Sequence, residues 1–188
     1  IQRLSTPSLT SPPNVPGYSF NSPAWSPDGT RIAFDGTPTV NPQNYEEGIW
    51  VMDAGGYTNA SASPGSPESG NVQQLTYPSM DASLATLLQW SIADQGPTWS
   101  HDSARIAFVR EHHPKPGTGA PFRLSLYVVN ANGENLQQLT DSPGIEYGNH
   151  TGWQAFGFLD RAPAWSRDGT RIAFSRTIGN TADVFVID

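Results

Sequence analysis

The sequence predicts an all-β fold, and three observations support it: an internal repeat, strand-like runs after each repeat, and many turn-forming residues. The 188 residues include 18 glycines and 17 prolines, which disfavour helices and shape turns. Hydrophobic residues make up 36% of the chain, a share that argues against global disorder. We expect one domain over residues 1–188, which would bury roughly 70% of its unfolded surface.

The composition argues against several classes of partner and chemistry. A net charge of −7 and an isoelectric point near 4.9 make nucleic acid and anionic membranes poor partners. The absence of cysteine removes disulfides, thiolate metal sites and a cysteine nucleophile. No apolar run approaches the ~20 residues that span a bilayer, so membrane insertion is not expected.

The repeat consists of three segments that align without gaps, residues 23–34, 97–108 and 163–174. Eight positions are identical in all three copies, namely Pro, Trp, Ser, Asp, Arg, Ile, Ala and Phe. Each copy reads as a hairpin, in which a strand with the tryptophan meets a turn and Arg-Ile-Ala-Phe forms the second strand. Asp-Gly is a strong tight-turn signal, and the second copy has Asp-Ser in its place. The repeated acids are therefore predicted to form turns: Asp28, Asp102 and Asp168.

Further strands follow each hairpin. Runs of β-branched and aromatic residues predict a third strand at residues 49–53, 126–130 and 184–188. A fourth strand is expected at residues 72–76 and 136–140. The third copy stops without one, yet residues 1–5 match the missing strand almost position for position. We therefore expect Ile1 and Leu4 to close the last unit beside Phe185 and Ile187, which would hide an open sheet edge.

This pattern, Pro-x-Trp-Ser-x-Asp-Gly-x-x-Ile-Ala-Phe followed by a strand and a final Leu-Thr, resembles the WD-type repeat of the TolB-like β-propeller family. The resemblance implies three four-stranded blades: blade one at about 22–77, blade two at about 96–141, and blade three at about 162–188 plus 1–6. It also implies a periplasmic or extracellular location. Members of such families include periplasmic scaffolds, peptidase-gating domains and some polysaccharide lyases.

Two features depart from the family pattern. The repeated tryptophans follow one another at intervals of 74 and 66 residues, against ~40–45 for a four-stranded blade, so long loops are inserted. Three blades also make a poor closed ring. The chain is then half of a six-bladed ring formed by two copies, a unit that propagates as a filament, or a fragment of a longer propeller. We favour association of copies, because the chain ends fall in matching phase.

The long loops are predicted to gather on one face and to carry aromatic and charged residues. Such residues stack on sugars or grip peptides, and they equally cover blade tops or pack in a subunit contact. The candidate binding residues are Tyr45, Glu46, Trp90, His112, His113, Tyr147, His150 and Trp153.

Metal binding and catalysis are poorly supported. His112, His113 and His150 invite a metal hypothesis, but adjacent histidines point apart in an extended segment and the spacings typical of metal sites are missing. No Gly-x-Ser-x-Gly motif is present, and the repeated serines indicate architecture. We expect no metal and no cofactor. Four acids are candidates for a carbohydrate enzyme by their location only, and we expect them to lie instead at a solvated rim: Glu46, Glu47, Asp160 and Asp183.

The remaining repeated residues are assigned structural roles. The tryptophans are predicted to pack between blades: Trp25, Trp99 and Trp165. The arginines that begin each second strand are expected to pair with a turn acid or with a neighbouring blade: Arg31, Arg105 and Arg171.

The leading functional hypothesis is a non-enzymatic binding or scaffold module that mediates protein–protein interaction or self-assembly. Its partners would be other copies of the chain or the remaining blades of a larger propeller, and a protein or glycan ligand. The alternatives are the propeller part of a larger peptidase-type hydrolase and a carbohydrate-binding or carbohydrate-active propeller. Glycosylation at Asn59 and Asn149 stays open.

Overall fold

The computed structural model describes residues 19–37, 46–54, 72–78, 89–114, 121–144 and 158–188. These residues form eleven β-strands, which confirms the all-β prediction. Within these ranges, no helix is long and apolar enough to cross a membrane.

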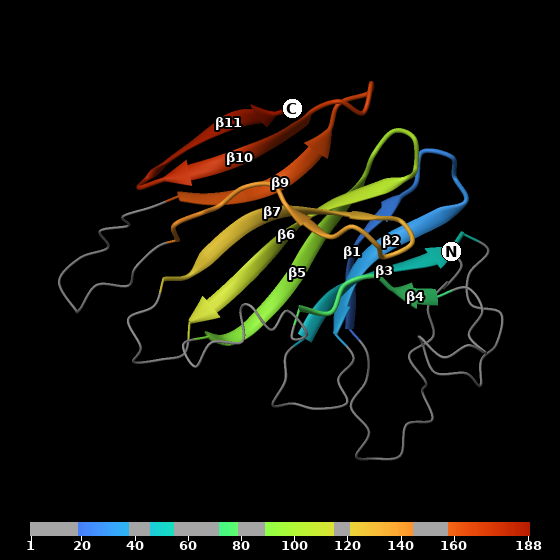
Figure 1. Cartoon of the computed structure of the whole chain (residues 1–188), viewed down its shortest axis with the longest axis horizontal. Helices are drawn as coiled ribbons and strands as arrows, with labels where there is room; N and C mark the ends of the chain where they lie inside the picture. The colour runs from blue at the N-terminus through green and yellow to red at the C-terminus, as the bar shows by residue number, and fades with distance from the viewer. Residues whose placement is uncertain (1–18, 38–45, 55–71, 79–88, 115–120, 145–157) are drawn as a thin grey trace, which may run out of the picture.

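The strands group into three units of consecutive antiparallel strands (Figure 1). The first unit holds β1 (Ser19–Trp25), β2 (Arg31–Thr37), β3 (Glu46–Asp53) and β4 (Val72–Gln74). The second unit holds β5 (Gln89–Trp99), β6 (Arg105–Pro114), β7 (Arg123–Asn130) and β8 (Gln137–Gln138). The third unit holds β9 (Phe158–Trp165), β10 (Ile172–Ile178) and β11 (Thr181–Ile187). The first strand of every unit begins several residues before the boundary that the repeat alone predicts.

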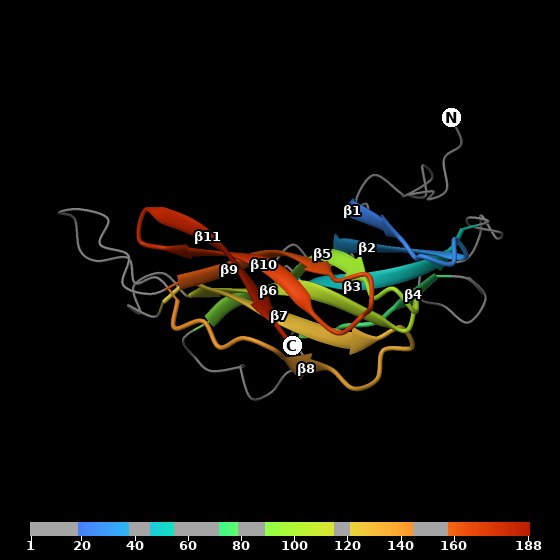
Figure 2. The same ribbon diagram turned by 90° about the horizontal axis from the view of Figure 1, so that it is seen from above.

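The second unit lies between the first and the third in both views (Figures 1 and 2). A short parallel pairing of Glu46 with Ile92 and of Glu47 with Ala93 joins β3 to β5, so the first two units share one sheet. The third unit is a separate three-stranded sheet, whose β9 contacts β5, β6 and β7. The predicted fourth strand of the third unit, residues 1–5, lies outside the described residues.

Each hairpin turn is held by the repeated serine and aspartate. The Ser26 hydroxyl donates to the Asp28 carboxylate at 2.6 Å and accepts from the Arg31 amide at 2.9 Å. The same two bonds recur at Ser100 and at Ser166. Donation by the serine hydroxyl, and then by the Thr30 amide, lowers the pKa of Asp28 to about 2. These contacts are the physical basis of the Trp-Ser-x-Asp repeat.

The second turn departs from Asp-Gly for a reason that the structure supplies. Gly29 and Gly169 have φ of +72° and +70°, in the left-handed region that glycine adopts without strain. Ser103 takes φ of +58° at the same position and is only 5% exposed. Its hydroxyl accepts a hydrogen bond from the Asp28 amide of the first unit at 3.2 Å. The serine hydroxyl therefore adds a side-chain hydrogen bond between two units, which glycine cannot make.

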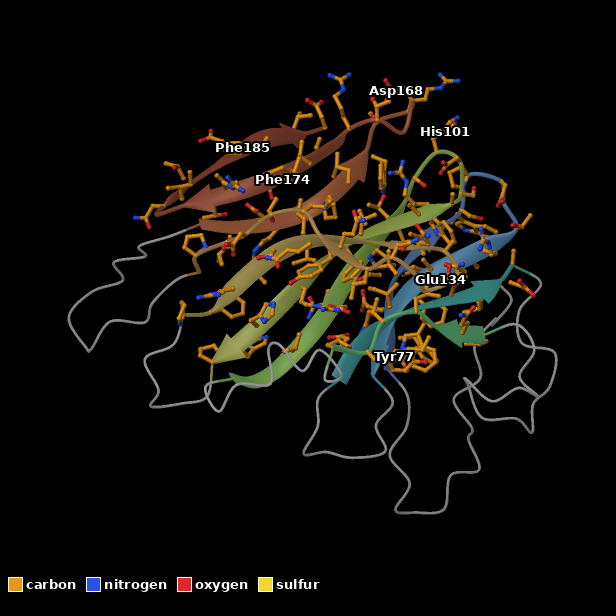
Figure 3. All side chains as sticks on the ribbon, in the orientation of Figure 1. Tyr77, His101, Glu134, Asp168, Phe174 and Phe185 are labelled. Carbon is orange, nitrogen blue, oxygen red and sulfur yellow. The ribbon has the colours of Figure 1, made fainter. Side chains whose placement is uncertain are left out.

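The core is built by stacking the units face to face. Strand residues alternate between faces, so on β6 Ile106 and Phe108 face the first unit while Val109 faces the third. The first interface buries side chains of both units: Ala33, Ile49, Val51, Leu75, Trp99, Ile106, Phe108, Tyr127 and Val129. The second interface is smaller: Val109, Leu124, Leu126, Leu159 and Phe174. Figure 3 shows Phe174 and Phe185 side by side on β10 and β11, with ring centroids 5.9 Å apart.

Candidate functional site

An arginine of the first unit grips the second unit beside its turn. The Arg31 guanidinium lies 4.8 Å from the centroid of the Trp99 ring, within cation–π range. Its Nη2 donates to the carbonyl oxygen of Ser103 at 2.7 Å. The Trp99 indole in turn donates to the Ala24 carbonyl at 3.0 Å. Three directional contacts therefore hold one unit against the next.

The same contact recurs between the second and third units. Arg105 stacks over Trp165 at 4.6 Å and donates to the carbonyl oxygen of Gly169 at 3.1 Å. Because Gly169 and Ser103 occupy the same position of the repeat, the two contacts are copies of one motif, which we call the Arg–Trp clasp. The Trp165 indole differs in one respect, since its buried nitrogen has no hydrogen-bond partner in the described part of the chain. The expectation that these arginines reach the neighbouring unit is confirmed for Arg31 and Arg105.

The prediction that every repeated tryptophan packs between units is not met for Trp25 within the single chain. Trp99 is 5% exposed, whereas Trp25 is 59% exposed. The physical reason is position along the stack. No described unit precedes the first one, so no described arginine covers the Trp25 ring.

An open cavity of about 410 Å³ borders the first clasp. Both clasp arginines line it and already stack on rings and donate to carbonyl oxygens of the next unit. The other lining residues come from the second unit: Ser103, Ala104, Asn130, Ala131 and Asn132. The cavity is therefore walled by residues that hold the units together.

A group of carboxyl side chains lies at the seam between the first and second units. Gln95 Nε2 is 3.2 Å from Glu47 Oε2 and 3.4 Å from Glu111 Oε2, so one amide bridges two carboxyls. Asp35 is 2% exposed and accepts a hydrogen bond from the Gly96 amide at 3.0 Å. We call Asp35, Glu47 and Glu111 the acidic seam.

Burial and crowding change the acidity of this seam. Burial, followed by the negative charge of Asp35 and a hydrogen bond shared with it, raises the pKa of Glu47 to about 7. Donation by Gln95 opposes this rise, and the charge of Glu111 adds to it. Glu47 therefore takes up or releases a proton near neutral pH. That chemistry makes the seam sensitive to pH.

The predicted loop placement of four candidate residues is wrong. Glu46 lies on β3, Trp90 on β5, and His112 and His113 on β6. For the last three, the reason is that the antiparallel ladder of β5 and β6 continues to the pair Gln89 and Pro114, well beyond the repeated segment. Glu46 belongs to β3 because that strand extends to pair with Ile92 on β5. The other candidates, Tyr45, Tyr147, His150 and Trp153, lie outside the described residues.

The two adjacent histidines do point apart, as expected for an extended strand. His112 is 4% exposed, while the His113 side chain is 41% exposed. His113 Nε2 lies 3.0 Å from Glu111 Oε2, and its ring packs against Phe122 with centroids 5.0 Å apart. Within the described ranges, no group of three or more histidine and carboxylate side chains gathers as a metal site.

Two ion pairs were missed by the sequence analysis. Asp94 accepts two hydrogen bonds from Arg110, at 2.6 and 2.8 Å, and both side chains are fully buried. Asp160 accepts the equivalent bonds from Arg176, at the same two distances. The available signal was an Asp and an Arg sixteen residues apart in both copies. Location at a solvated rim is therefore wrong for Asp160, which is buried, while Asp183 is exposed on β11.

Comparison with known proteins places the fold and little else. No family model and no curated protein matches the chain. Among solved structures, a protein from Agrobacterium tumefaciens assigned as a TolB is similar, with a TM-score of 0.52 and 18% identity. The likeness covers 94% of this chain and 47% of that one, so the chain spans about half the length of that protein. At this identity the likeness shows a TolB-like, all-β fold.

Proposed function

We propose that the chain is a non-catalytic binding or scaffold module of a TolB-like propeller, which acts by protein–protein interaction or self-assembly outside the cytoplasm. The observation that carries the proposal is the outer edge of β11, with which no described strand pairs. An unpaired edge is a template for a further strand.

The first two units show how such an edge is completed. The Ile49 amide donates to the Thr76 hydroxyl at 2.9 Å, and the Leu75 amide donates back to the Ile49 carbonyl at 2.7 Å. In the second unit, Leu126 makes the same two bonds with Thr140 and Leu139, at 2.9 and 2.8 Å. In both units, a leucine and then a hydroxyl residue therefore follow the fourth strand and continue its pairing.

The third unit offers the same backbone groups without a described partner. Val184 occupies the position of Ile49 and Leu126, yet it is 79% exposed where they are fully buried. Residues 1–5 end in Leu-Ser, which supplies the leucine amide and the hydroxyl that this edge lacks. We infer that this segment, from the same chain or from a second copy, forms the fourth strand of the last blade.

The likeness to half of a TolB supports the wider proposal. Because the likeness covers 47% of that protein, the rest of a TolB-like propeller would come from other copies or from further blades. The three units are then three blades of a propeller that closes only on association. The location outside the cytoplasm also follows from the TolB resemblance.

The test is the mass of the chain in solution, measured by light scattering with and without residues 1–6. We expect dimers or larger assemblies that become smaller on trimming. Val184→Pro, which removes the backbone donor at the centre of the β11 edge, should act like trimming. Asp183→Asn serves as the matched surface change on β11, because Asp183 is exposed there, and it should leave the mass unchanged. Monomers in every case would refute the proposal.

A further inference from the structure

The two ends of the stack carry the two halves of an Arg–Trp clasp. Trp25 corresponds to Trp99 and Trp165 and is 59% exposed at the first unit. Arg171 corresponds to Arg31 and Arg105, is exposed at the third unit, and stacks on no ring among the described residues. One end therefore presents a ring without its cation, and the other presents the cation.

We propose that the chain associates end to end with a second copy of itself, through a clasp between Arg171 of one copy and Trp25 of the other. This deepens the proposed scaffold function and rests on it. The Arg171 guanidinium would stack on the Trp25 ring and donate to the carbonyl oxygen of Gly29, which holds the turn position of Ser103 and Gly169.

The third unit also presents the apolar surface on which such a tryptophan packs. Inside the chain, Trp99 shares one buried cluster with Ile49 and Val51 of the preceding unit. Their counterparts on the third unit are Val184 and Val186, which are 79% and 58% exposed. Burial of a tryptophan against these two valines would remove apolar surface from water on both partners.

The contact is centred on the rim of the first unit. The apolar row on its outward face is already buried in the single chain, at 3–7% exposure: Ile32, Phe34, Trp50 and Met52. Trp25 is the large side chain that this face leaves exposed among the described residues. A partner that binds at this edge of the first unit therefore contacts Trp25 and the Asp28-Gly29 turn beside it.

A second copy is the occupant that the structure supports, because the contact already joins this chain's units twice with the same residue types. The chain also matches 47% of the TolB structure, so two copies correspond to its length. A pair of copies would close with two such clasps, one at each junction.

The experiment measures the dissociation constant of the full chain by analytical ultracentrifugation over a dilution series. Trp25→Ala and Arg171→Ala each remove both clasps of a closed pair. With each desolvated clasp worth roughly tenfold in affinity, either variant should weaken association roughly a hundredfold. Arg167→Ala on the same turn and Tyr77→Ala on the first unit are matched controls for lost charge and lost ring, and should leave the constant unchanged. Circular dichroism should show native folding for all variants.

Mixing the two variants gives the sharpest result. The Trp25→Ala chain keeps Arg171, and the Arg171→Ala chain keeps Trp25, so a mixed pair retains one clasp. The mixture should associate roughly tenfold more weakly than the native chain and more strongly than either variant alone. A monomeric native chain, or unchanged constants for both variants, would overturn the proposal. Association that depends on residues 1–6 but not on Trp25 would leave the strand-exchange proposal standing and refute the clasp between copies.

Discussion

The second and third units are built from the same repeat but differ in how much of it is buried. In the second unit the Arg110–Asp94 pair is fully buried, and Leu126 on β7 is fully buried too. In the third unit Arg176 of the equivalent pair is 20% exposed, and Val184 at the position of Leu126 is 79% exposed. The second unit has a neighbour on each face, and the third has a described neighbour on one.

This comparison shows that burial in a stacked fold belongs to the interface and not to the residue. Each unit contributes one half of each contact, and the contact exists only where a neighbour supplies the other half. The exposed positions of the terminal units are therefore unused contacts, and their chemistry describes the partner that would cover them.

The first unit has no charged residues at the two positions that form the buried ion pair in the other units. Its positions for the buried ion pair are held by Phe20 and Gly36, which face each other across β1 and β2. Phe20 packs edge-on against Phe34 with centroids 5.0 Å apart, and Trp50 donates to the Gly36 carbonyl at 3.2 Å. An apolar set thus replaces the ion pair in the same framework, as expected where burying charge costs as much as pairing returns.

The largest difference in stability between equivalent positions is expected at the tryptophans. Trp99→Ala should destabilise the protein by roughly 3–5 kcal/mol, because it removes a buried ring and leaves a cavity. Trp25→Ala should cost no more than about 0.5 kcal/mol in the monomer, since its ring is exposed. Urea denaturation measures both, and equal losses would contradict the burial difference.

Loss of an ion pair should also destabilise the protein more in the second unit than in the third. Asp94→Asn leaves a fully buried arginine without its counter-charge and should cost about 3–5 kcal/mol. Asp160→Asn should cost less, because Arg176 is partly exposed and water can compensate for the lost carboxylate. Thermal melts of the two variants decide this, and a larger loss at Asp160 would show that the third unit is covered in solution.

The acidic seam predicts a pH dependence of stability. The pKa of Glu47 is about 7 in the folded protein and 4.5 when unperturbed. The unfolded chain therefore loses this proton first, and the free energy of unfolding should fall as pH rises from about 4.5 to 7. After discounting for solvent screening of this half-buried group, the fall is about 1 kcal/mol. Glu47→Gln should flatten the profile in that window, whereas the exposed control Glu134→Gln should not.

The smallest effect is expected at the turn of the second unit. Ser103→Ala removes the hydroxyl that accepts from the Asp28 amide and keeps the left-handed backbone, at a cost of about 0.5–1 kcal/mol. Thr170→Ala on the third unit removes a hydroxyl that donates to Asp168 within its own turn, and it serves as the control position. A chemical denaturation series with an unchanged midpoint for Ser103→Ala would exclude a role for this hydroxyl between units.

The sequence predicts the structure that depends on local interactions. The Ser–Asp turn network, the strand after each turn and the all-β class follow from residues close together in the chain, because hydrogen-bonded turns and alternating apolar residues need only local neighbours. The repeat also carried the register, since Arg31, Arg105 and Arg171 stand at one position. The repeat does not predict the length of β5 and β6, because their ladder continues through polar residues that are also common in loops.

Only the tertiary structure decided which copies of a residue are buried. Trp25, Trp99 and Trp165 share the same Pro-x-Trp-Ser-x-Asp context, yet one is exposed, one is buried and one is half-buried. The same holds for the carboxyls, since the pKa of Glu47 is raised first by burial and then by the charges of Asp35 and Glu111, which other strands bring to the seam. Sequence specifies the surfaces that each unit presents. Contact between units, which is set by the order of the stack and by what covers its ends, determines which of those surfaces become core.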